Sequence, residues 1–127
     1  MKKLAVMTAA VLLASAALCA FSVLWTTAVM NRAHVLATET AVRMEKGDDV
    51  GAKELLTDLA LLWDEQERLL EVLCDHEDLH TVKQHIIQAK ICLEYADMED
   101  LFAAVALIGE GLEHIRCEEA LSWTNLL

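Results

Sequence analysis

Two short runs of cysteine and histidine contain the side chains best suited to binding a metal ion. Cys74, His76 and His80 follow the pattern Cys-x-His-x3-His, and His114 with Cys117 follows His-x2-Cys. Thiolate and imidazole are zinc ligands, and His76 and His80 would lie one helical turn apart. However, the spacings match no established zinc motif, and His76 at a helix joint can bond a free backbone group. We therefore expect no metal or other cofactor, with zinc bound by His76, His80, His114 and Cys117 as the alternative.

Other reaction chemistries have little support in the residue types. A Cys–His nucleophile pair could be built from the same side chains, but no orienting partner or oxyanion site accompanies it. Ser15 and Ser22 lie in an apolar run, which leaves Ser122 alone. The carboxylates follow the charged faces of amphipathic helices, and four glycines without a cluster form no phosphate-binding loop. We therefore expect a protein that is not an enzyme.

An uncharged stretch, Leu4–Met30, follows Lys2 and Lys3 at the N-terminus. It exceeds the roughly 20 residues that cross the hydrocarbon core of a bilayer as a helix. A signal peptide cleaved after Ala14-Ser15-Ala16 is the alternative, but cleavage would leave another apolar segment at the new N-terminus. We expect an uncleaved signal anchor in the cell membrane, with a cytoplasmic N-terminus and the rest of the chain extracytoplasmic.

The charge of the chain excludes one class of partner. Lys2 and Lys3 precede the apolar run, whereas all 21 Asp and Glu follow it, and the net charge of the whole chain is −11. Such an acidic surface is repelled by the phosphates of DNA and RNA. We therefore expect no nucleic-acid partner.

The remainder of the chain has the pattern of a helical bundle. Proline is absent, and polar joints at Gly47-Asp48-Asp49, Asp75–Asp78 and Ala96-Asp97 separate stretches of helical spacing. Short joints imply antiparallel neighbours. The fold class is thus all-α, with an N-terminal transmembrane helix followed by a small antiparallel bundle. We divide it into residues 1–31, the cytoplasmic start and anchor, and residues 32–127, the acidic bundle domain.

Beyond the anchor, which we expect to continue straight outward, three helices should bury one another. The apolar positions expected to face inward are Leu55, Leu56, Leu59, Leu62, Trp63, Leu69, Leu70 and Leu73 in the first, Leu79, Val82, Ile86, Ile87, Ile91 and Leu93 in the second, and Met98, Leu101, Phe102, Val105, Ile108, Leu112 and Ile115 in the third.

The cysteines and tryptophans add four expectations. Cys19 lies in the apolar run, and the other three cysteines are expected to be reduced and buried. Trp63 should belong to the core, and Trp25 should lie at the membrane interface. Residues 118–127 should dock on the bundle as a short final helix with Trp123 inward, the alternative being an apolar tail that meets a partner.

The order of several residues resembles a known family. They are Trp63, Asp75-His76, Leu79, Val82, Leu112, His114-Ile115, Glu119 and the closing Leu121-Ser122-x-Thr124-Asn125-Leu126-Leu127. They are similar to a membrane-anchored family of spore-forming Firmicutes, domain of unknown function 4363, although Trp123 is atypical of its tail. The resemblance implies a bacterial envelope protein connected with sporulation, and the family has no assigned activity to transfer.

These observations favour a non-enzymatic interaction subunit of the bacterial cell envelope. It would contact membrane lipid through its anchor and another membrane protein through its bundle. The alternative is a helical-bundle sensor of a ligand or metal. The residues expected to make structural or partner contacts are Trp63, His76, His114, Trp123, Asn125 and Leu126.

Overall fold

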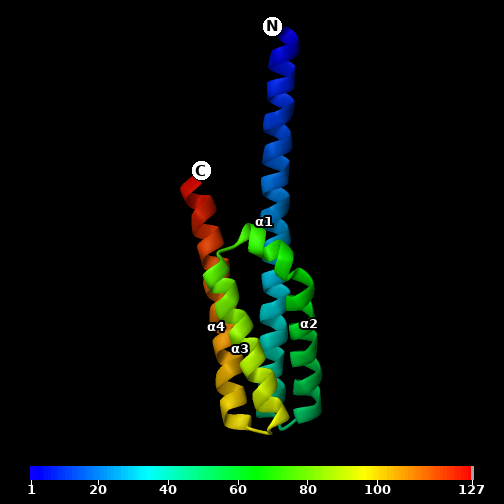
Figure 1. Cartoon of the computed structure of the whole chain (residues 1–127), viewed down its shortest axis with the longest axis vertical. Coiled ribbons are helices and arrows are strands. Elements are labelled where there is room, and N and C mark those ends of the chain that lie inside the picture. Colours follow the sequence, from blue (N-terminus) through cyan, green and yellow to red (C-terminus); the bar gives the residue numbers. More distant parts are fainter. Residues whose placement is uncertain (127) are drawn as a thin grey trace.

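The computed structural model describes residues 1–126, with the side chains of residues 1–119 and Leu121. Four helices follow one another along the chain: α1 (Lys2–Glu45), α2 (Asp49–Leu73), α3 (His76–Glu94) and α4 (Met98–Leu126). Sequential helices are antiparallel, and α1 also packs against α4 (Figure 1). No strand occurs in this described part of the chain. The prediction of an all-α bundle is therefore confirmed.

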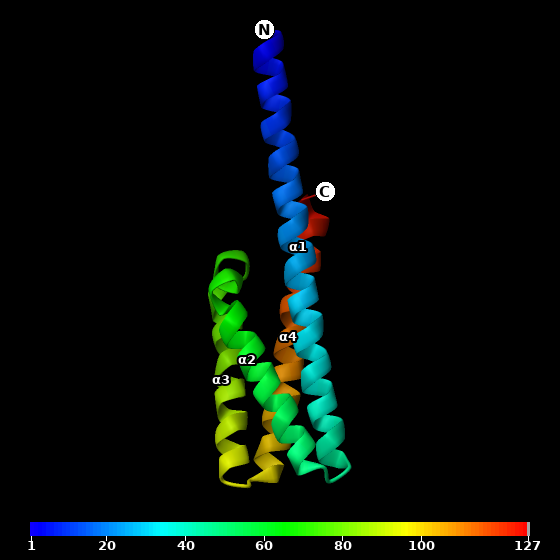
Figure 2. The same cartoon turned by 90° about the vertical axis from the view of Figure 1, so that its right-hand side faces the viewer.

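Helix α1 has two halves with different surroundings. Residues 1–21 are exposed on every side and project beyond the bundle, as both views show (Figures 1 and 2). This half is long and apolar enough to cross a membrane. The second half is a bundle helix, with buried side chains along one face: Thr26, Val29, Met30, Ala33, Ala37 and Thr40. As expected, the helix continues outward without interruption, and the boundary drawn between residues 31 and 32 falls inside it.

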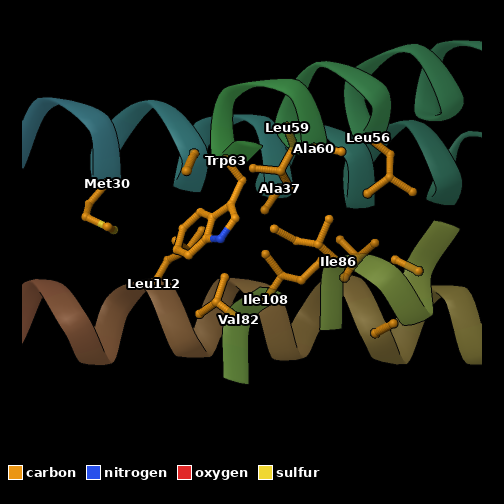
Figure 3. Packing of buried hydrophobic residues seen from close by; sticks show 14 of the residues in the cluster. Met30, Ala37, Leu56, Leu59, Ala60, Trp63, Val82, Ile86, Ile108 and Leu112 are labelled. Atoms are coloured by element: carbon orange, nitrogen blue, oxygen red, sulfur yellow. The ribbon is translucent and has the colours of Figure 1, made fainter. Parts of the chain in front are cut away.

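The core therefore has four contributing helices rather than the expected three. Trp63 of α2 is confirmed as a core residue, being 1% exposed. Its indole points from α2 toward Leu112 of α4, with Met30 and Ala37 of α1 nearby (Figure 3). The second half of α1 thus covers apolar surface that the other three helices leave open.

Several apolar residues expected to face inward are instead exposed. They are Leu69 and Leu73 of α2, Ile87 and Ile91 of α3, and Phe102 of α4. On α3 the buried positions are Leu79, Val82, Ile86, Ala89 and Cys92. Ile87 lies one residue past this row, and one residue turns the side chain by about 100° around the helix.

Small residues allow α3 and α4 to approach closely. Ala89 is completely buried on α3. A Cβ atom placed on Gly111 of α4 would lie 2.7 Å from Cγ2 of Val82, so the two helices approach closely only because this position is glycine. Gly111 and Ala89 thus permit the close approach of α3 to α4, while Ile87 and Ile91 lie outside the buried row.

The predicted joints are confirmed in position, although the one expected at Asp75–Asp78 is shorter, since α3 already begins at His76. Three aspartates accept hydrogen bonds from the first free N–H groups of the following helices: Asp48 from Gly51 at 3.0 Å, Asp75 from Glu77 at 2.8 Å, and Asp97 from Asp100 at 3.2 Å. Gly47 ends α1 in the left-handed region with φ +76°. Ala96 occupies the equivalent position before α4 with φ 55°. This left-handed conformation is strained for alanine, because it brings the Cβ atom close to the following carbonyl oxygen.

The C-terminal segment differs from the prediction. Residues 118–126 continue α4 without a break, so no separate final helix forms. The C-terminal end of α4 extends past the α2–α3 joint, at the end of the bundle from which the exposed half of α1 projects (Figures 1 and 2). The inward orientation expected for Trp123 concerns a side chain outside the described residues.

Truncating Met30 tests whether α1 belongs to the core. Met30 is 1% exposed, so Met30→Ala should lower the free energy of unfolding by about 2–5 kcal/mol through lost burial and a new cavity. Val35→Ala is the matched control, because Val35 is exposed on the same helix and its loss should change stability by less than about 0.5 kcal/mol. Urea unfolding in mild detergent, followed by circular dichroism, measures both. Equal stability of the two variants would contradict the assignment of α1 to the core.

Candidate functional site

The candidate site is an acidic pocket between the α2–α3 joint and α4. Its volume is about 170 Å³, and its lining residues are Leu73, Cys74, Asp75, Asp78, Ile115, Glu118 and Glu119. The joint lies at the end of the bundle from which the exposed half of α1 projects (Figures 1 and 2). If that half enters a bilayer, the pocket faces the membrane side of the domain.

Local structure explains how these side chains converge. Asp75 is the N-cap of α3, and Asp78 follows in the first turn of that helix. On α4, Ile115 is buried and sets the rotation of the helix at this level. His114 and Glu118, four residues apart, therefore lie on one face of α4 and can reach Asp78.

His114 connects two carboxylates from different helices. Its Nε2 atom lies 3.7 Å from Oδ1 of Asp78 and 3.3 Å from Oε1 of Glu118. A hydrogen bond with Asp78 and repulsion from its charge raise the pKa of the Glu118 carboxyl, although His114 acts in the opposite direction. In the described part of the chain, this trio is the group of His, Cys, Asp and Glu close enough together to share a metal ion.

Cys74 and Glu119 form a second polar pair in the same pocket. The Cys74 thiol donates to Oε1 of Glu119 at 3.2 Å. Burial, together with the hydrogen bond to Glu119 and its charge, raises the pKa of the Cys74 thiol to about 12. Burial also raises the pKa of Glu119. Because the thiolate is the nucleophile, this environment makes Cys74 a poor one.

The structure separates the residues first considered as zinc ligands. His76 and His80 line a different hollow with Glu67, Glu71, Leu79 and Lys83. The Gln84 amide donates to Nε2 of His80 at 3.0 Å. Cys117 lies 3.8 Å from a Glu113 carboxylate oxygen. Of the four predicted ligands, His114 belongs to the trio described above.

The cysteines are only partly as expected. All four are free, Cys92 is buried and Cys74 is half-buried, but Cys117 is exposed, as is Cys19. The expectation that Cys117 is buried is therefore wrong, because it follows Ile115 by two residues and points away from the bundle face.

Sequence reasoning missed the carboxylates of this pocket. The i, i+4 spacing of His114 and Glu118 was visible in the sequence, but Asp78 belongs to another helix. Its proximity to His114 depends on the pairing of α3 with α4. The half-buried Glu119 was likewise assigned to a solvated face.

Comparison with known proteins agrees with the division of α1 into an exposed half and a half that belongs to the bundle. The sequence profile described as Domain of unknown function (DUF4363) matches residues 26–126. The chain belongs to this family. The match begins at Thr26, the first buried residue of α1, so the DUF4363 domain comprises the second half of α1 together with α2, α3 and α4. Neither a curated protein nor a solved structure matches the chain.

The remaining predicted contact residues of this DUF4363 protein have different environments. Trp63 is in the core, whereas His76 and His114 are exposed. The side chains of Trp123, Asn125 and Leu126 lie outside the described residues, although their backbone is part of α4. Thus His114 is the predicted contact residue that borders the acidic pocket.

The environment of Cys74 predicts slow alkylation. With a pKa of about 12, a fraction of about 10⁻⁴ of the thiol is ionised at pH 8, so iodoacetamide should modify the exposed Cys117 first. Glu119→Gln removes the charge that opposes ionisation and should accelerate alkylation of Cys74 by about tenfold, equivalent to one pKa unit. Peptide mass spectrometry over time measures both rates. Glu110→Gln, at an exposed α4 position outside the pocket, is the control, and equal rates in the two variants would contradict the role of Glu119.

Proposed function

We propose that this DUF4363 protein is a single-pass, non-enzymatic interaction subunit of the bacterial cell envelope, connected with sporulation. Its bundle contacts another membrane protein. The observation that supports this proposal most directly is the uninterrupted α1, which has an exposed apolar half and a half buried in the bundle. The resemblance to a family of spore-forming Firmicutes supports the bacterial setting.

The continuity of α1 favours an anchor over a cleaved signal peptide. Cleavage after Ala16 would leave the exposed, apolar Leu18, Phe21 and Leu24 at the start of the helix. In a bilayer these side chains contact lipid instead of water, which stabilises them by about 1.5–3 kcal/mol each. Trp25, half-buried against the bundle, lies where the two halves meet and suits the membrane interface. Without a hinge in α1, the bundle has a restricted orientation relative to the membrane.

An apolar stripe on α3 is the surface proposed for the partner. Ile87, Ile91 and Tyr95 are spaced four residues apart and are 48%, 50% and 79% exposed. Four-residue spacing places Ile87 and Ile91 on one face of α3, and Tyr95 follows at the C-cap of that helix. On a strongly acidic domain, such a stripe is more readily explained by a protein partner than by solvent. The tail residues Trp123, Asn125 and Leu126 are the second proposed contact.

Membrane integration and sidedness can be tested together. The protein should remain with membranes after alkaline carbonate washing, since α1 would be embedded in lipid. A membrane-impermeant maleimide should label the exposed Cys117 in intact cells, because we propose an extracytoplasmic domain. Cys117→Ser controls for labelling at other cysteines. Release by carbonate would contradict the anchor, and labelling only after permeabilisation would place the domain in the cytoplasm.

Site-specific photo-crosslinking in native membranes tests the interaction role. A photoreactive residue at Ile91 or Tyr95 should form one adduct of defined mass, because both side chains lie on the proposed contact stripe. The same residue at Lys53, an exposed position on α2, is the control. Ile87→Glu should abolish the Ile91 adduct by placing a charge within the stripe. No adduct at either position, or the same adduct at Lys53, would argue against this surface.

A further inference from the structure

We propose that Asp78, His114 and Glu118 form a binding site for a divalent transition-metal ion, with zinc the best match. This site goes beyond the interaction role and does not depend on it. It also differs from the set His76, His80, His114 and Cys117 considered from the sequence, with which it shares His114.

The separations between the ligand atoms fit a small ion. Nε2 of His114 is 3.3 Å from the Glu118 oxygen and 3.7 Å from the Asp78 oxygen, and all three ligand atoms lie within 4.8 Å of one another. A tetrahedral zinc ion with bonds of about 2.0–2.1 Å has ligand atoms about 3.3 Å apart. Small side-chain rotations therefore suffice to place all three atoms around one ion.

The chemistry of the ligands selects a transition metal. Imidazole with two carboxylates suits zinc and similar ions, whereas calcium prefers six to eight oxygen ligands. Three protein ligands leave the fourth tetrahedral position for water or for a group from another molecule. Two of the proposed ligands, Asp78 and Glu118, also line the acidic pocket.

The charge balance of the pocket favours a divalent cation. Asp78 and Glu118 face each other, and Asp75 and Glu119 line the same pocket. Two nearby basic side chains bind elsewhere: Arg116 to Glu113 and Asn31, and Lys83 to Glu67. A divalent ion held between Asp78 and Glu118 would supply two positive charges to these two carboxylates.

Binding would connect two helices without being required for folding. Asp78 is in the first turn of α3, and His114 and Glu118 are on α4. The apolar core of α3 and α4, including Val82, Ile108 and Leu112, is complete without the ion. A chelator should therefore leave the helical fold intact, while added zinc should raise the melting temperature by stabilising only the folded state.

Zinc titration of the chelator-treated, full-length protein in mild detergent tests the site. One zinc ion per chain should bind, and His114→Gln and Glu118→Gln, which each remove a direct ligand, should weaken binding by at least the roughly 10–100-fold that loss of an outer-shell partner costs. His80→Gln and Cys117→Ser are matched controls that should retain full affinity. Circular dichroism verifies that each variant is folded.

Cobalt(II) provides a second readout that does not depend on stability. A site of one nitrogen and two oxygen ligands should give visible bands of a tetrahedral ion without the intense thiolate absorption of a cysteine ligand. Loss of binding in Cys117→Ser or His80→Gln would assign the metal to the other set of residues. Absence of saturable binding would overturn the metal-site proposal, and it would leave the crosslinking result unaffected.

Discussion

Trp63 extends from α2 into the space between α1 and α4, and the arrangement of the bundle depends on how this side chain is covered. Burying so large a residue stabilises the fold, although its indole nitrogen has no hydrogen-bond partner in the described part of the chain. An unpaired buried N–H costs about 1–3 kcal/mol, so the apolar packing must exceed that amount. The small Ala33 and Ala37 are both buried on α1 and allow that helix to approach closely. The packing of α1 around Trp63 thus joins the bundle to the helix whose first half is suited to the membrane.

This constraint also positions the acidic pocket. Helices α1 and α4 lie side by side. The C-terminal part of α4 therefore passes the α2–α3 joint at the end of the bundle from which the exposed half of α1 projects (Figure 2). The pocket is consequently assembled from a helix N-terminus and the side of a neighbouring helix. His114 is the basic side chain that contacts the pocket carboxylates, whereas Arg116 and Lys83 bind Glu113 and Glu67 instead.

Some of the candidate site could be predicted from the sequence. His114 was recognised by its residue type, and its four-residue spacing to Glu118 is a local property of a helix. Asp78 and Cys74 could not be associated with α4, since they are 36 and 45 residues away from His114 and Glu119 respectively. The grouping of His114 with His76, His80 and Cys117 relied on ligand type alone. Without helix pairing, residue type does not say which ligands meet.

The sequence by itself determined the helices, their joints and the apolar half of α1. These features depend on short-range chemistry: aspartate caps, glycine in the left-handed region, and uncharged side chains over the length of a membrane crossing. Only the tertiary structure decided that α1 supplies a fourth bundle helix, that Ile87 and Ile91 face outward, and that Asp78 meets His114. Each of these outcomes depends on the rotation of one helix against another. Close contacts such as that between Gly111 and Val82 fix this rotation. The apolar pattern of a single helix does not fix it, because the apolar stripe covers a wide part of the helix surface.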